Sequence, residues 1–242
     1  MALRNINYKI MNMKERIWLK ALDCIKEAFE QNSCRYFLDT GTLLGAIRDK
    51  QFIPWDNDID IGVVDCENIS ICIKNICDYM YRHGYNVTAT NHEIDVFDDT
   101  GILNLGVKFY DHESGEYKTS FGKVCGSPTM HMLYNSLSNI IIYKRGYGAY
   151  YIKSIFSSFL RIIGPIIPKC LIDYLDRKSN VINQSLTIPD VLLNSFSDYI
   201  FYNNQYKVPT NYTDYLEYRY GKGWSKPNPN YNYITDDNAI KR

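Results

Sequence analysis

The sequence predicts an α+β fold in which a mixed β-sheet is flanked by helices. Two amphipathic segments have apolar residues at helical spacing, and short apolar runs bounded by turn residues follow each of them. No internal repeat or low-complexity linker divides the 242 residues. We therefore expect a single domain over residues 1–242, with a core at about 13–125 and a mostly helical, then tyrosine-rich C-terminal part at about 126–242.

The first elements follow from periodicity and turn chemistry. Apolar residues recur at helical spacing over Met13–Gln31, which predicts an amphipathic helix. The apolar run Tyr36–Leu38 predicts a short strand, and Asp39–Gly41 predicts the turn after it. Thr42–Arg48 is expected to form a brief helix, and Gln51–Trp55, which contains a proline, an extended loop.

The next elements complete the predicted sheet. Asp58–Val64 alternates into a buried apolar run, which is typical of a strand. Asn68–His83 has a helical pattern that Gly84 would close. Tyr85–Phe97 and Leu103–Tyr110 are expected to be β-rich.

Composition excludes some partners and favours a reducing compartment. Lys plus Arg and Asp plus Glu number 27 each, so no basic footprint for nucleic acid exists. Seven cysteines without CxxC or Cys/His ligand spacing predict reduced, buried thiols rather than a zinc site. The charged N-terminus lacks an apolar signal region, so we expect a cytoplasmic protein. The apolar stretch Ile155–Ile172 contains charges and prolines, which is compatible with a buried helix pair or with contact at a membrane face.

Three aspartates two residues apart raise an electrostatic problem. Asp56, Asp58 and Asp60 would lie on one side of an extended segment, where like charges repel. A divalent cation resolves this, because carboxylate oxygens suit Mg²⁺ and Mn²⁺. We predict Asp58 and Asp60 as metal ligands, and Asp56 as a residue that holds the loop or binds through water.

The residues upstream fit a phosphate that accompanies such a cation. Gly41 lets backbone N–H groups approach an anion, and Thr42 can add a hydroxyl. Arg48 can neutralise a further phosphate oxygen. Each has an ordinary structural explanation alone, as a turn, a helix cap and a surface charge, but together and in this order they favour a metal–phosphate site.

The stretch YFLDTGTLLGAIRDKQFIPWDNDIDIG closely resembles the signature of the LicD family, which includes fukutin and fukutin-related protein. The LicD family belongs to the nucleotidyltransferase superfamily. That superfamily's pattern of an apolar residue, glycine and a small hydroxyl residue falls on Leu38–Thr42, and its acid–apolar–acid triplet falls on Asp58–Asp60. Val208–Pro229 is similar to the family's closing motif. The resemblance implies a nucleotidyltransferase-like fold over nearly the whole chain, with a helical middle.

The resemblance also implies a third carboxylate on a neighbouring strand, as a metal ligand or base. Asp95, in EIDVFDD, matches the local pattern of an aspartate between apolar residues. Asp111, in VKFYD, lies farther on, at a predicted strand end where it could face the site. We favour Asp111 as the third catalytic acid beside Asp58 and Asp60.

The function implied is transfer of a phospho-alcohol group from a CDP-linked donor, such as CDP-choline or CDP-ribitol, to an acceptor hydroxyl. The acceptor would be a glycan or glycolipid, which would bring the protein to a membrane face. Two alternatives stay open, namely nucleotide transfer from an NTP and nucleotide binding without catalysis. CMP release, pyrophosphate release or binding without turnover would distinguish the three.

Overall fold

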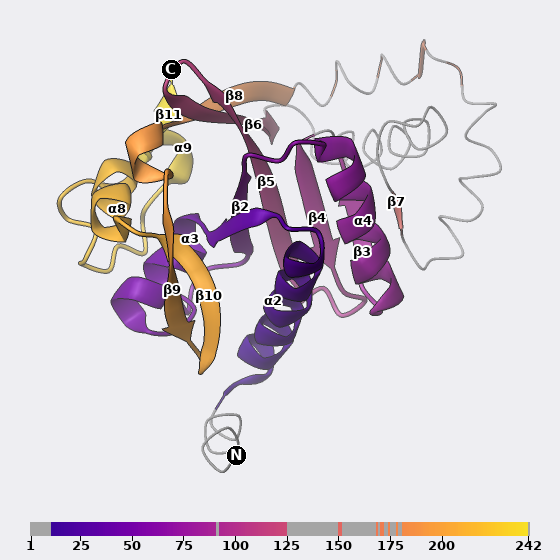
Figure 1. Cartoon of the computed structure of the whole chain (residues 1–242), viewed down its shortest axis with the longest axis horizontal. Helices are drawn as coiled ribbons and strands as arrows, with labels where there is room; N and C mark the ends of the chain where they lie inside the picture. Colours follow the sequence, from indigo (N-terminus) through magenta and orange to yellow (C-terminus); the bar gives the residue numbers. More distant parts are fainter. Residues whose placement is uncertain are drawn as a thin grey trace.

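The computed structural model describes residues 11–90, 92–124, 150–151 and 181–241, together with residues 168, 170, 171, 174 and 178. Within these ranges the first half alternates helices and strands as far as α4 and then continues with four successive strands (Figure 1). Its elements are α2 (Met13–Gln31), β1 (Arg35–Leu38), α3 (Thr40–Leu44), the π-helix η1 (Gly45–Asp49), β2 (Ile59–Val64), α4 (Ile69–Arg82), β3 (Asn86–Ala89), β4 (Glu93–Phe97), β5 (Asn104–Glu113) and β6 (Glu116–Val124).

The described part of the second half holds more strands than helices. Its elements are β7 (Tyr150–Tyr151), β8 (Val181–Pro189), the 3-10 turn η3 (Asp190–Leu192), β9 (Phe196–Phe201), β10 (Asn204–Pro209), α8 (Tyr212–Tyr220), α9 (Tyr233–Asp236) and β11 (Ile240–Lys241). The expected mostly helical C-terminal half is not confirmed, and most of the apolar stretch 155–172 lies outside the described residues.

Strand β5 is the centre of a nine-stranded mixed sheet. It pairs in parallel with β2 on one edge and antiparallel with β4 on the other. Its last three residues pair with β6, which continues through β8 to β11. The β2–β5 pair is the one parallel pairing among the described strands, so the predicted mixed sheet is confirmed.

The two faces of the sheet have different roles. Ile59, Ile61 and Val63 of β2 are buried on one face, and on that side of the sheet Figure 1 shows helices α2 and α4 side by side. Asp60 and Gly62 alternate onto the other face. Gly62 is required there, because a Cβ at this position would collide with the Phe37 ring.

The C-terminal segment packs onto the Asp60 face through aromatic and ionic contacts. Phe37 stacks on Phe196 with ring centroids 5.2 Å apart and meets Tyr215 of α8 edge-on at 6.0 Å. The buried guanidinium of Arg219 donates to Asp39 at 3.1 Å and to Asp237 at 2.9 Å. Asp39 follows β1, so this buried ion network ties α8 directly to the turn between β1 and α3.

The predicted elements of the first half are confirmed with small shifts in their ends. The helix over 13–31 is found as predicted, with an Asn12–Glu15 capping box at its start. The brief helix begins at Thr40 rather than Thr42, because Asp39 caps it with its side chain. No helix in the described ranges has the length and hydropathy needed to cross a membrane.

The buried ion network gives a prediction about stability. Replacing Arg219 by Met leaves the buried Asp39 and Asp237 carboxylates without their cation, and we expect the free energy of unfolding to fall by about 3–5 kcal/mol. The matched control, Lys207→Met, removes an exposed pair with Asp198 and should cost less than about 1 kcal/mol. Urea unfolding measures both, and equal losses would contradict a structural role for Arg219.

Candidate active site

A cavity of about 740 Å³ lies between the α3–β2 region and the C-terminal segment, and we call it the acid cavity. One wall comes from α3 and β2, with Thr40, Gly41, Asp58 and Asp60. The opposite wall comes from the segment after α8. Its volume is in the usual range for small-molecule sites. The structure thus brings together the predicted pair Asp58–Asp60 and the predicted Gly41.

Asp56 and Asp58 share this cavity in an unfavourable arrangement. Burial, followed by the charges of Asp60 and Asp56, raises the pKa of Asp58 to about 7. Burial also raises the pKa of Asp56, which lies close enough to Asp58 for the two carboxyl groups to interact. Without a cation, burial and the neighbouring charges therefore favour a proton on this pair near neutral pH, where ordinary aspartates would hold none.

Asp60 is held differently from its neighbours. Burial alone would raise its pKa, but the Lys108 ammonium, 3.1 Å from Asp60 Oδ1, and the Thr40 hydroxyl together lower it. The carboxylate of Asp60 is therefore charged and fixed in place by two donors. Lys108 reaches it because β5 pairs with β2 and places Lys108 two residues beyond Gly106, which lies opposite Asp60.

The turn into α3 brings Gly41 close to one of the acids. A Cβ at Gly41 would collide with the Asp56 carboxylate as it is placed here, so a larger residue would require this side chain to move. Thr40 beside it has a φ of +38°, which is strained for a β-branched residue. Strained backbone of this kind concentrates at ligand sites, where the surroundings hold it.

Two predicted phosphate contacts have other partners in the structure. Thr42 is buried, and its hydroxyl accepts the Asp60 backbone N–H at 2.9 Å, so it joins α3 to β2 rather than lining the acid cavity. Arg48 does line the cavity, but its guanidinium donates two bonds, of 2.8 and 2.7 Å, to Asp49. Thr40 presents the hydroxyl that was expected from Thr42.

The strand register places the candidate third acids. Asp111 lies five residues beyond Gly106 on β5, roughly 17 Å along the strand. Its carboxylate is exposed and 3.6 Å from His92, and it does not line the acid cavity. Asp95 lies opposite Gly106, across which it faces Asp60, and Glu93 lies opposite Lys108 and lines the cavity. The structure thus brings Glu93 and Asp95, but not Asp111, toward the pair.

Glu93 has an unusual protonation equilibrium. Burial, then the neighbouring Asp95 charge, raises the pKa of Glu93 to about 7, although Lys108 opposes this. Burial also raises the pKa of Asp95, against the hydrogen bond from Thr88. The period-2 pattern of EIDVF contains the signal for Glu93, because Glu93 and Asp95 must share one face of their strand.

The wall from the C-terminal segment contributes aromatic rings and cations. No role in the site was predicted for these residues from the sequence. Trp55 of the loop before β2 faces the same space, and its side chain is half exposed. In the described part of the chain, Lys226 forms no ion pair with a carboxylate. The other residues of this wall include Tyr220, Trp224, Tyr231 and Tyr233.

The donor set fits a hard divalent cation. Asp56, Asp58 and Asp60 offer carboxylate oxygens, the ligands that Mg²⁺ and Mn²⁺ prefer. Among the described residues, no cluster of three or more His, Cys, Asp or Glu side chains is already arranged around a cation position. Mg²⁺ commonly uses one or two protein carboxylates and completes its shell with water and phosphate, so an arrangement completed by substrate agrees with this chemistry.

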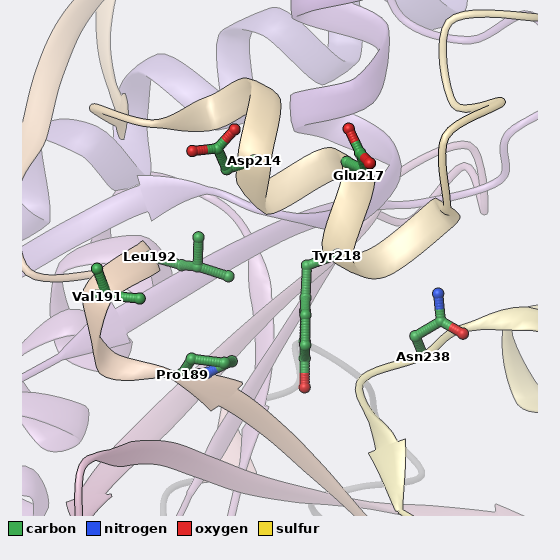
Figure 2. Close-up of a pocket in the computed structure, with 7 residues that line it drawn as sticks. All are labelled: Pro189, Val191, Leu192, Asp214, Glu217, Tyr218 and Asn238. Atoms are coloured by element: carbon green, nitrogen blue, oxygen red, sulfur yellow. The ribbon is translucent and has the colours of Figure 1, made fainter.

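A second hollow, of about 640 Å³, contains none of the predicted site residues. Figure 2 shows Tyr218 of α8 between Leu192 and Asn238, with Asp214 and Glu217 along the same helix. The Tyr218 hydroxyl donates a hydrogen bond to the Thr187 carbonyl oxygen at 3.0 Å. The residues that line it include two acids and no cation, and we assign it no chemistry.

Comparisons with known proteins show which family part of this chain is similar to. Residues 33–100 match the domain family described as "LicD/FKTN/FKRP, nucleotidyltransferase domain". An uncharacterized protein of Rickettsia prowazekii is 31% identical over 81 residues, which is 34% of this chain and 30% of the relative. An uncharacterized protein of Rickettsia typhi is 23% identical over 161 residues, 66% of this chain and 46% of the relative.

A third relative, whose name states an activity, is the lipopolysaccharide cholinephosphotransferase LicD of Haemophilus influenzae. It is 44% identical over 55 residues, which is 22% of this chain and 21% of that protein. The chain therefore spans less than half the length of these three curated relatives.

The electrostatics of the acid cavity predict opposite changes in the free energy of unfolding when Asp58 and Asp60 are neutralised. Unfolded aspartate ionises near pH 3.8 and folded Asp58 near pH 7, so the metal-free protein loses stability as the pH rises between these values. Above pH 7, Asp58→Asn should therefore raise the free energy of unfolding by about 1–2 kcal/mol, a value discounted for the partial solvation of this side chain.

Asp60→Asn should lower the free energy of unfolding by about 1–3 kcal/mol, because it removes the carboxylate that neutralises the buried Lys108 ammonium. Thermal unfolding in a chelator measures both variants. Stabilisation by both substitutions, or by neither, would contradict the different environments of the two acids.

Proposed function

From the premise that residues 33–100 form a LicD-family domain, we propose that this chain is a divalent-metal-dependent transferase of phospho-alcohol groups. The donor would be a CDP-linked alcohol and the acceptor a hydroxyl of a glycan or glycolipid. The observation that carries the proposal is the grouping of Asp56, Asp58 and Asp60 in one cavity that is large enough for a nucleotide-linked donor. Since the chain covers less than half of its relatives, donor and acceptor are both proposals.

Asp58 and Asp60 would hold the cation, with Asp56 as a further oxygen ligand or a ligand through water. Bound Mg²⁺ or Mn²⁺ would neutralise the diphosphate and the leaving CMP. Binding would also relieve the repulsion that keeps a proton on the Asp56–Asp58 pair. Occupation of the acid cavity should therefore release a proton.

The chain's own residues would seat the diphosphate around this position. Gly41 allows close approach of the backbone at the start of α3, and Thr40 fixes Asp60 through its hydroxyl. Lys226 on the opposite wall is free to neutralise a phosphate oxygen. Arg48 lies at the cavity but would have to leave Asp49 to contribute its charge, so we assign it a smaller role.

Glu93 is the group best placed to take the proton of the acceptor hydroxyl. It lines the acid cavity, and its pKa of about 7 suits a general base at neutral pH. Asp95, across Gly106 from Asp60, would keep that pKa high through its charge. Asp111 was the acid favoured from sequence, and its exposed place beyond the cavity assigns it no step.

The aromatic wall favours a cationic alcohol over a neutral polyol. Trp55, Trp224 and Tyr233 line the same cavity as the acids. A quaternary ammonium group gains cation–π attraction from such rings, whereas a neutral ribitol gains none. We therefore expect choline rather than ribitol as the transferred alcohol.

A donor screen with Mg²⁺ tests the proposal. We expect CMP release from CDP-choline, about tenfold or more above that from CDP-ribitol, and no pyrophosphate from any NTP. Chromatography separates and quantifies the released CMP and pyrophosphate. Pyrophosphate release would instead support the nucleotidyltransferase alternative, and Mg²⁺-dependent binding of CDP-choline without turnover would support the non-catalytic one.

Two variants make this screen specific. Asp58→Asn should abolish CMP release while the protein remains folded, since it removes a predicted ligand that is not needed for packing. Trp55→Leu changes a half-exposed ring, so the fold should survive, and the preference for CDP-choline over CDP-ribitol should fall. An equal loss with both donors would mean that this ring contacts the cytidine instead.

The third acid is tested by a matched pair of variants. Glu93→Gln keeps the shape of the side chain but cannot accept a proton, and we expect kcat to fall about 10²–10⁴-fold with little change in KM. Asp111→Asn changes an exposed acid outside the acid cavity and should leave kcat within about twofold of the wild type. The reverse ranking would restore Asp111 as the base.

A further inference from the structure

Three cysteines meet at the edge of the sheet opposite the acid cavity. Cys34 precedes β1, Cys66 follows β2, and Cys72 lies in the second turn of α4. The antiparallel register explains part of this gathering, because Arg35 pairs with Val64 and so the start of β1 meets the end of β2. Helix α4 then starts at Ile69 and brings Cys72 to the same corner.

The thiols of this cluster are in contact. Cys34 Sγ lies 2.6 Å from Cys72 Sγ, and Cys66 lies close enough to Cys72 for the two thiols to interact electrostatically. All three are free thiols in this structure. Cys72 is 7% exposed, whereas Cys34 and Cys66 are partly exposed, so a reagent from solvent would meet Cys34 or Cys66 before Cys72.

The corner that carries these thiols is fixed by other contacts. Arg35 forms an ion pair with Asp65, and the Tyr117 hydroxyl donates to Asp65 at 3.0 Å. Asp65 follows β2 directly and precedes Cys66 in the chain. The backbone around the cluster is therefore held from both sides, and joining two of its sulfurs requires no large movement of a strand or helix.

We propose that Cys34 and Cys72 form a reversible, oxidant-dependent disulfide. The oxidant is a low-molecular-weight disulfide such as oxidised glutathione. The Cys34 thiolate attacks one of its sulfurs and releases one glutathione thiolate, which leaves a mixed disulfide on Cys34. The Cys72 thiolate then attacks the Cys34 sulfur and releases the second glutathione. Two protein thiols thereby lose two protons and two electrons, and the oxidant becomes two glutathione thiols.

The position of this pair gives the bond a structural effect. Cys34 and Cys72 are 38 positions apart, and the loop that they close contains β1, α3 and the three aspartates Asp56, Asp58 and Asp60. Asp65 lies five residues from Asp60 along the chain, roughly 17 Å in a strand, so the cluster does not touch the acid cavity. Closing such a loop restricts the unfolded chain most strongly in the segment that holds the site.

Peptide mapping of the full-length protein tests the pairing without relying on activity. After treatment with oxidised glutathione at mildly alkaline pH, we expect one Cys34–Cys72 linked peptide, the loss of two hydrogen atoms in intact mass, and full reversal by dithiothreitol. Alkaline conditions are needed because contact with Cys34 and burial raise the pKa of the Cys72 thiol. A Cys66–Cys72 link, or glutathione adducts with no internal link, would overturn the proposal.

Thermal unfolding provides a second readout with matched variants. Oxidised wild type should melt roughly 5–10 °C above its reduced form. Cys34→Ser should abolish this difference. Cys24→Ser, a partly buried thiol of α2 outside the cluster, and Cys66→Ser should both retain it. If Cys34→Ser does not fold, the linked peptide of the wild type still decides the pairing, and an unchanged melting temperature despite that link would refute the effect on stability.

Discussion

The ion pair between Asp39 and Arg219 is the contact on which the arrangement of this protein depends. Asp39 caps α3 at the end of β1, and Arg219 lies 180 residues later, on α8. Neither charge is tolerable alone in the interior, so each fixes the position of the segment that carries the other. The acid cavity exists because this pair holds the C-terminal wall against the turn at Gly41.

Within the cavity, charge is distributed unequally among residues of the same type. Asp60 is neutralised by Lys108 and stays ionised, whereas burial raises the pKa of both Asp56 and Asp58. Burial, followed by the charge of Asp95, raises the pKa of Glu93 to about 7 as well. Environment rather than residue type therefore assigns the expected roles of ligand and base, a pattern that recurs in enzymes with paired carboxylates.

Much of the first half of the fold could be predicted from sequence because local rules govern it. The helix over 13–31 and the strand at the Asp58–Asp60 signature follow from periodicity alone. The site residues were harder, since Thr42 was expected at the start of the helix and Asp111 at a strand end, whereas the helix begins at Thr40 and the strand register brings Glu93 to the cavity. No sequence pattern around Arg219 indicated its role, because its partners meet it only in the folded structure.

At Gly106, strand β5 pairs with β2 on one edge and with β4 on the other, so Asp60 and Asp95 both lie opposite this glycine. A single inserted or deleted residue within this strand would turn Lys108 to the helix-covered face and an apolar side chain toward Asp60. Length changes during divergence should thus accumulate in the connections on either side of β5, and the spacing from Gly106 to Lys108 should vary less than the identity of the surrounding apolar residues.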